Sequence, residues 1–136
     1  MKKKKPVVFL SGPMRNIPRE SGVAWRKQAQ KLLSPTCDII SPYQGREKKE
    51  AFLDSRGAVI RDLRNIERAD ILVVNDTYKN ASMIGTSMEV FYAHQLNKVV
   101  LVFGEAHKGD YFLEYHSHSR LPSLKEACKL ILNLFI

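Results

Sequence analysis

Ile71-Leu72-Val73-Val74-Asn75 and, further along, Gly85-Thr86-Ser87-Met88-Glu89 form the stretch around which this chain is organised. The first segment is a continuous apolar run, which is typical of a strand covered on both faces of a sheet. The second is a turn that leads into a helical pattern reaching Ala93. Ligands of open α/β sheets bind beyond the carboxyl ends of the strands. Because this turn leaves such an end, we expect it to lie beside a ligand site.

Strand and helix patterns alternate on both sides of this stretch. Continuous apolar runs predict further strands over 7–10, 37–40 and 99–103. Helical spacing of apolar residues predicts helices over 25–33, 52–67 and 87–96, and one opened by Pro122. Residues 104–119 are predicted to form a loop with room for a fifth short strand. This alternation predicts an α/β fold with one doubly wound parallel sheet of four to five strands and helices on both sides.

The helical spacing also predicts which side chains face the core. The inward sets are Trp25, Ala29, Leu32 and Leu33; Val59, Leu63 and Ile66; and Leu124, Cys128, Ile131 and Phe135. In the first of these helices, Arg26 is assigned to the opposite, polar face together with Lys27, Gln30 and Lys31.

Length and charge limit the class of protein. The 136 residues, 44% of them hydrophobic, fit one domain over 1–136, with 1–5 as a basic tail. The net charge of +8 suits an anionic partner, but half of that excess is the run Lys2–Lys5. No aromatic residues interleave with this run, which disfavours nucleic-acid binding. The apolar run after it stops at Ser11-Gly12-Pro13, too short for a signal peptide or a membrane span, so a soluble cytoplasmic protein is expected.

Several familiar chemistries lack their motifs. The chain has no P-loop, no GxGxxG after the first strand, no HExxH and no GxSxG. His116-x-His118 has no third ligand nearby, and Cys37 and Cys128 lie far apart in the sequence without metal-ligand spacing. We therefore expect free, buried thiols, no metal and no cofactor.

Glu89 has two interpretations. In the first turn of a helix, unpaired N–H groups and the helix dipole favour an ionised carboxylate, which can act as a nucleophile. Thr86-x-x-Glu89 is equally a capping box, in which the glutamate only reaches back to the cap. The spacing alone is equally compatible with a nucleophile and with a capping residue. The position of Glu89 beyond the end of a strand, where ligands of such sheets bind, favours the catalytic role.

Two further sites carry charged residues. Ser11-Gly12-Pro13-Met14-Arg15 directly follows a strand, so its N–H groups, hydroxyl and guanidinium suit an anion, although Arg15 also fits a solvated turn. Asp62 falls on or beside the inward face of its helix, where it either bonds nearby backbone or faces a pocket as a proton donor. Asp70 opens a strand and is expected to be structural.

Taken together, these motifs resemble the nucleoside 2-deoxyribosyltransferase superfamily. They cover residues 7–102 in the family's order: Phe9-Leu10-Ser11-Gly12-Pro13-Met14, Asp62 with Ile66, Ala69-Asp70-Ile71, Gly85-Thr86-x-x-Glu89 with Ala93, and Val99-Val100. The resemblance implies a flavodoxin-like sheet, with Glu89 attacking the anomeric carbon of a nucleoside or nucleotide. It implies that Asp62 assists departure of the base. It also implies a homodimer or higher homo-oligomer whose active sites are completed across a subunit interface.

The superfamily contains transferases that act on deoxynucleosides and hydrolases that act on nucleoside 5′-monophosphates. Arg15 resembles the phosphate-binding arginine of the hydrolases, and we favour that branch. Further substrate-binding candidates are Ser11, Gly12, Pro13, Met14, Tyr43, Ser82, Gly85, Ser87 and, from an adjacent subunit, Ser117. Tyr43 either stacks on the base or packs in its loop. The chain departs from the transferases at Phe91, where they often carry a small residue, and at Asn80-Ala81-Ser82-Met83, where they carry an acidic one.

Two other classes of function stay open. A protein that only binds nucleic acid would show an affinity that falls steeply with salt and would release no base. A nucleotide sensor with an inactive site would bind mononucleotides without turning them over.

Overall fold

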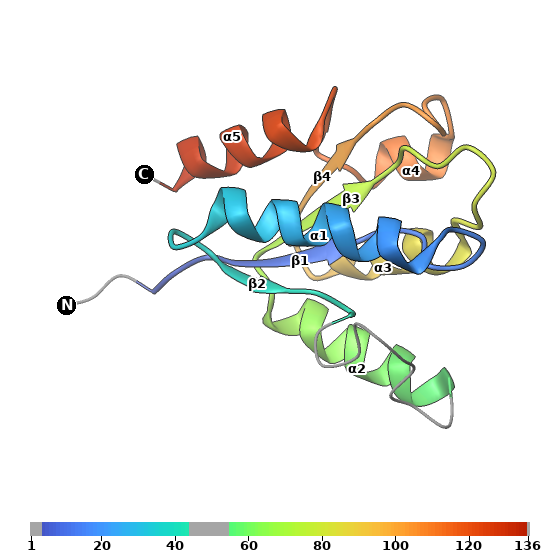
Figure 1. Ribbon diagram of the computed structural model, residues 1–136, viewed down its shortest axis with the longest axis horizontal. Coiled ribbons are helices and arrows are strands. Elements are labelled where there is room, and N and C mark those ends of the chain that lie inside the picture. Colours follow the sequence, from blue (N-terminus) through green and yellow to red (C-terminus); the bar gives the residue numbers. More distant parts are fainter. Residues whose placement is uncertain (1–3, 44–54, 136) are drawn as a thin grey trace.

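The computed structural model describes residues 4–43 and 55–135, and its centre is a five-stranded parallel sheet (Figure 1). The order is β2-β1-β3-β4-β5, and every neighbouring pair is parallel. The predicted doubly wound α/β fold is therefore confirmed. The strands are β1 (Val7–Ser11), β2 (Asp38–Ile40), β3 (Ile71–Asn75), β4 (Val99–Phe103) and β5 (Ser119–Leu121).

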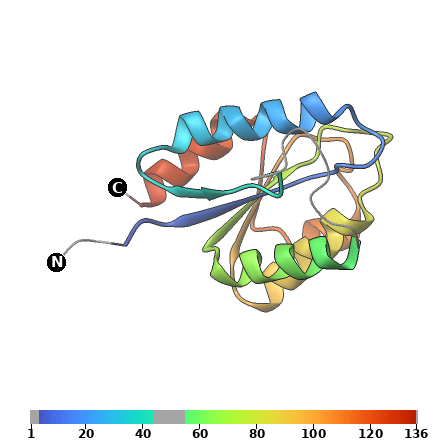
Figure 2. The same ribbon diagram turned by 60° about the horizontal axis from the view of Figure 1, so that its bottom comes forward.

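Helices cover both faces of the sheet (Figure 2). One face carries α1 (Arg19–Leu33) and α5 (Leu124–Leu134), and the other carries α2 (Ser55–Arg68) and α3 (Ile84–Gln95). The short helix α4 (Tyr111–Tyr115) packs on the α2/α3 side through the buried Leu113. None of the helices in the described ranges is long and apolar enough to cross a membrane.

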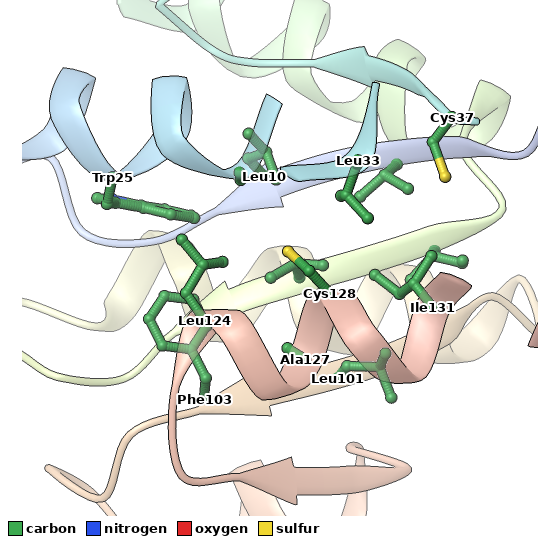
Figure 3. Packing of buried hydrophobic residues seen from close by; sticks show 14 residues of the cluster. Leu10, Trp25, Leu33, Cys37, Leu101, Phe103, Leu124, Ala127, Cys128 and Ile131 are labelled. Carbon is green, nitrogen blue, oxygen red and sulfur yellow. The ribbon is translucent and has the colours of Figure 1, made fainter. Parts of the chain in front are cut away.

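Alternation along the strands divides the core into two layers. Val8 and Leu10 face α1 and α5, whereas Phe9 between them faces α2 and α3. Figure 3 shows the first layer, in which Trp25 meets Phe103 edge-on with ring centroids 5.5 Å apart. Trp25 is thus a core residue, as predicted. Cys37 and Cys128 lie in the same layer as free thiols, and burial raises the pKa of Cys128 to about 11.

Three predictions about helices need correction. Val59 is 56% exposed, because only the later half of α2, with Leu63 and Ile66, packs against the apolar layer of the sheet. Phe135 is 42% exposed, since α5 ends just before it. The helix α4 was not predicted at all, because its length of five residues is too short to show a helical period.

The topology determines where a ligand can bind. The chain leaves β1 toward one face of the sheet and leaves β3 toward the other, so the order reverses between these two neighbouring strands. A crevice at such a reversal is the usual ligand site of this strand order. Figure 1 shows the loops that follow β1, β3 and β4 at the end of the molecule opposite the two termini.

Candidate active site

Ser11 and Glu89 meet at the reversal point between β1 and β3. Ser11 ends β1 and, because Leu10 faces α1, its side chain faces the α2/α3 layer. Its hydroxyl donates a 2.6 Å hydrogen bond to Oε1 of Glu89 on α3. Ser11 is fully buried and Glu89 is half-buried. One predicted candidate from the first loop and one from the central turn are therefore in contact.

The position of Glu89 within its helix differs from the prediction. The helix α3 begins at Ile84 rather than at Ser87, so Glu89 lies in the second turn, away from the unpaired N–H groups. The capping box is also wrong, because the cap is Met83, which makes no side-chain capping bond, and Thr86 is buried inside the helix. Gly85 suggested a turn, but a glycine costs an exposed helical turn only about 1 kcal/mol.

The surroundings of Glu89 make protonation easier. Burial is the main reason that the pKa of Glu89 rises to about 7 from 4.5, and the negative charge of Asp62 adds to the rise. The Ser11 hydrogen bond and the positive charge of Arg26 act in the opposite direction. Glu89 is therefore an acid–base group that titrates near neutral pH, unlike an ordinary surface glutamate.

Asp62 faces the same site from α2. It is half-buried, with Oδ1 shielded from solvent. Its negative charge adds to the burial that raises the pKa of Glu89, and it opposes slightly the burial that lowers the pKa of Arg26. The structure thus brings the two predicted catalytic carboxylates close enough to influence each other, from two helices on the same face of the sheet. Asp70, by contrast, accepts a 2.8 Å bond from the Val7 backbone N–H, which agrees with its predicted structural role.

Arg26 belongs to this site although the sequence analysis placed it on the polar face of its helix. It is only 2% exposed and lies on the stripe of α1 that also contains Gly22, Ala29 and Leu33. The helical spacing of Arg26 from Gly22, Ala29 and Leu33 is compatible with an inward position, but a charged residue is normally expected on the exposed face of a helix. The cost of burying that charge lowers its pKa to about 10, so the guanidinium stays protonated at neutral pH.

Tyr43 is 3% exposed and packs against α1. Its ring lies 5.1 Å from the guanidinium carbon of Arg26 and also 5.1 Å from that of Arg19. A Cβ added to Gly22 would come within 2.8 Å of the Tyr43 hydroxyl. This position supports the loop-packing alternative for Tyr43 over stacking on a base.

The remaining predicted residues fall into three groups. Gly12 and Pro13 are buried in the turn after β1, with Met14 half-buried and Arg15 exposed beyond them. Ser82 and Ser87 flank the start of α3 at the same edge of the sheet, and a Cβ added to Gly85 would meet only open space. Ser117 lies just before β5 and so at the amino-terminal edge of the sheet, whereas Glu89 is bonded to Ser11 at the carboxyl edge.

A second polar cluster at the carboxyl edge is structural. The Asp76 carboxylate is fully buried and accepts bonds from the His107 backbone N–H at 2.9 Å, from the His107 ring at 2.6 Å and from Arg120 at 2.8 Å. Arg120 also donates to Glu114. These bonds join the loop after β4, the helix α4 and β5 to the end of β3. No group of three or more metal-binding side chains was found within 4–43 and 55–135.

We expect replacement of Glu89 by glutamine to stabilise the fold in alkaline solution. Between about pH 4.5 and 7 an unfolded chain releases this proton while the folded protein keeps it, so stability falls as the pH rises through that window. The penalty is then constant above pH 7. Glu89→Gln should therefore gain about 2 to 3 kcal/mol of unfolding free energy relative to the parent between pH 4.5 and pH 8. Urea unfolding at the two pH values measures this difference.

The matched control for this experiment is Glu126→Gln, on an exposed turn of α5. The Glu126 carboxylate is exposed and lies 3.8 Å from Lys129, so the change in the control's difference from the parent between the two pH values should be far smaller than that of Glu89→Gln. A Glu89→Gln difference that varies as little with pH would contradict the raised pKa.

Comparison with known proteins finds solved structures that share this fold. Neither a family model nor a curated protein matches the sequence. The 2-deoxyribosyltransferase of Bacillus psychrosaccharolyticus is 20% identical, with a TM-score of 0.69 over 89% of both chains. The CMP N-glycosidase BcmB of Clostridium botulinum is 17% identical, with a TM-score of 0.61 over 95% of this chain and 99% of that one.

A protein that is described as a binding protein rather than an enzyme has a similar fold. The molybdenum cofactor binding protein of Rippkaea orientalis is 12% identical, with a TM-score of 0.66 over 99% of this chain and 100% of that one. Similarity at these identities shows the fold alone. The function must therefore be argued from the residues of the site.

Proposed function

We propose that this protein hydrolyses the N-glycosidic bond of a nucleoside or deoxynucleoside 5′-monophosphate, releasing the free base and the sugar phosphate. The observation that carries the proposal is that Glu89, bonded to Ser11 at the carboxyl edge of β1, is buried and lies within the influence of a second carboxylate, Asp62 on α2. Cleavage of a glycosidic bond passes through an oxocarbenium-like state and needs two carboxyl groups with different protonation. The site supplies both groups.

The proposed reaction proceeds in two steps. The first step starts once the proton that Glu89 carries has passed to the Asp62 carboxylate. A Glu89 oxygen then forms a bond to the anomeric carbon as the bond from that carbon to the base nitrogen breaks, and Asp62 gives that proton to the departing base. Water then attacks the sugar ester, with Asp62 taking a proton from the water, and Glu89 is released as a carboxylate. The Ser11 hydroxyl, which donates to Oε1 of Glu89, orients the nucleophile.

The phosphate is proposed to bind where the β1–α1 loop approaches the start of α3. Arg15 is exposed on that loop, so its long side chain can reach a ligand in front of Glu89. Ser87, the other phosphate candidate, is exposed on α3 but lies two residues before Glu89 and therefore on another side of the helix. An arginine is well suited to a phosphate because its planar guanidinium donates two parallel bonds. This element distinguishes the hydrolase from the alternative, a transferase that exchanges bases between unphosphorylated deoxynucleosides.

A panel of nucleosides and their 5′-monophosphates, each with and without an acceptor base, tests this assignment. We expect base release from the monophosphates, and Arg15→Ala should raise KM for them about 10- to 100-fold with little change in kcat, because phosphate binding contributes equally before and during the reaction. Arg68→Ala is the control, since Arg68 precedes β3 at the opposite edge of the sheet. Equal turnover of nucleosides, or transfer to the acceptor base, would instead support the transferase.

We also propose that the protein is a homodimer joined through α3 and α4. Exposed apolar side chains gather on these helices: Ile84, Met88, Phe91, Tyr111, Phe112 and Tyr115. A groove of about 260 Å³ lies between Phe91 and Phe112 and is also lined by Ser87, close in sequence to Glu89. Apolar patches of this kind mark interaction sites. The groove borders α3, the helix that carries Glu89, so a second copy seated here would lie beside the site, and we propose that the partner's Ser117 contributes to it.

Changing Phe91 and Phe112 together to aspartate should dissociate this dimer, because two charges would be buried in an apolar interface. Sedimentation is expected to give twice the 15.6 kDa chain mass for the parent and a single chain for the variant. Phe135→Asp, which changes a partly exposed phenylalanine beyond α5, is the control and should leave the dimer intact. A parent that sediments as one chain at high concentration would contradict the proposal.

A further inference from the structure

Arg26 holds the turn that carries Ser11. Its Nε donates to the Leu10 carbonyl at 3.2 Å and its Nη2 donates to the Gly12 carbonyl at 3.2 Å. Its Nη1 donates to the carbonyl of Gly22 in its own helix at 3.0 Å. Leu10 and Gly12 are the neighbours of Ser11 in the sequence, so one guanidinium fixes the peptide unit before Ser11 and the peptide unit after Gly12.

Aromatic rings and close packing leave Arg26 little freedom. Its guanidinium carbon lies 4.5 Å from the ring centroid of Trp25 and 5.1 Å from that of Tyr43. A Cβ on Gly12 would come within 3.2 Å of the Trp25 ring and 3.1 Å of the Asn75 side chain. The turn is therefore packed between α1 and the end of β3, and the hydrogen bonds of the buried Arg26 guanidinium connect the turn to α1.

The same cation acts on Glu89 through space. Its positive charge favours the ionised form of that carboxylate, in opposition to burial and to Asp62. Arg26 thus influences Glu89 by two routes, through the orientation of the Ser11 hydroxyl and through its own charge.

We infer that Arg26 is a positioning residue of the active site: its guanidinium, bonded to the carbonyls on both sides of Ser11, holds the Ser11 hydroxyl against Glu89. The effect on turnover rests on the proposed function, whereas the effect on the Glu89 carboxyl group does not. Lysine cannot replace it, because an ammonium group lacks the planar fork that reaches the three carbonyls together and stacks between rings.

The test measures the titration of the Glu89 carboxyl carbon by nuclear magnetic resonance, with and without Arg26. In Arg26→Met the titration midpoint is expected to rise by about one pH unit, because both the charge and the fixed Ser11 hydrogen bond are lost. Arg26→Lys should retain part of the charge and shift the midpoint less. Both variants should lower kcat about 10-fold or more with KM nearly unchanged, as expected for an interaction that matters in the transition state.

The control is Lys31→Met, which removes an exposed charge from the same helix and should change neither the titration nor kcat. Folded variants in which the midpoint of Glu89 does not move would overturn the inference. Failure of both variants to fold, judged by circular dichroism, would also overturn it, because Arg26 would then serve the fold alone. A shifted midpoint in a protein without any base release would support the positioning role and refute the hydrolase.

Discussion

Glu89→Gln should lower the release of base from nucleoside 5′-monophosphates by at least about 1000-fold, the largest effect that we expect of any single change. Glutamine keeps the size of the side chain and can still accept a bond from the Ser11 hydroxyl, so the site should keep its shape. What it lacks is an ionisable oxygen that can bond to the anomeric carbon. Losing a covalent nucleophile commonly costs this much or more.

Measuring nucleotide affinity shows whether Glu89→Gln loses activity because the nucleophile is missing or because the site has changed shape. The affinity of Glu89→Gln for a nucleoside 5′-monophosphate, measured by calorimetry, should stay within about threefold of the parent, because the phosphate contacts remain. Glu126→Gln serves again as the control and should retain full activity. Turnover in Glu89→Gln at more than a tenth of the parental rate would show that Glu89 is not the nucleophile. Binding without turnover in the parent itself would indicate an inactive nucleotide sensor.

Asp62→Asn should lower kcat by about 100- to 1000-fold, with a loss that depends on the leaving base. An amide cannot give a proton to the departing nitrogen, and general acid catalysis typically contributes a factor of this size. A nucleotide whose base leaves readily without protonation should lose much less, so the plot of rate against the pKa of the base should become steeper. Steady-state kinetics on a series of modified bases measures this slope.

The control for Asp62 is Asp38→Asn at the exposed first residue of the edge strand β2, which should leave the rates unchanged. Removing the charge of Asp62 should also lower the pKa of Glu89 toward its ordinary value, since that charge contributes to the present rise. An Asp62→Asn variant that loses the same factor for every base would contradict the role of proton donor and leave Asp62 with an electrostatic one.

The sheet was readily predicted because its strands are covered on both faces. Such strands are continuous apolar runs, and 71–75 and 99–103 match β3 and β4 residue for residue. The helix ends were less predictable. The glycine in 85–89 and the polar residues around it suggested a turn, although the local cost of glycine was small enough for α3 to begin before it.

The site could be predicted only in part, for a similar physical reason. Glu89, Asp62 and Ser11 could be proposed from the sequence because a polar residue at the end of an apolar strand, or on the inward face of a helix, stands out from its neighbours. Arg26 was missed because burial of arginine is expensive and depends on three carbonyls and two rings that come from separate segments. The pKa of Glu89 likewise results from burial and from charges on α1 and α2, which sequence spacing does not measure.

The raised pKa of Glu89 alone would also suit a proton donor, so the assignment of roles needs a direct test. The protein should be incubated with a 2′-fluoro nucleoside 5′-monophosphate, in which the fluorine slows hydrolysis of a sugar ester, then quenched in acid and digested for mass spectrometry. We predict a sugar phosphate bonded to the peptide that contains Glu89, and none in Glu89→Gln. A sugar on Asp62, or turnover with no adduct on either carboxylate, would contradict the account.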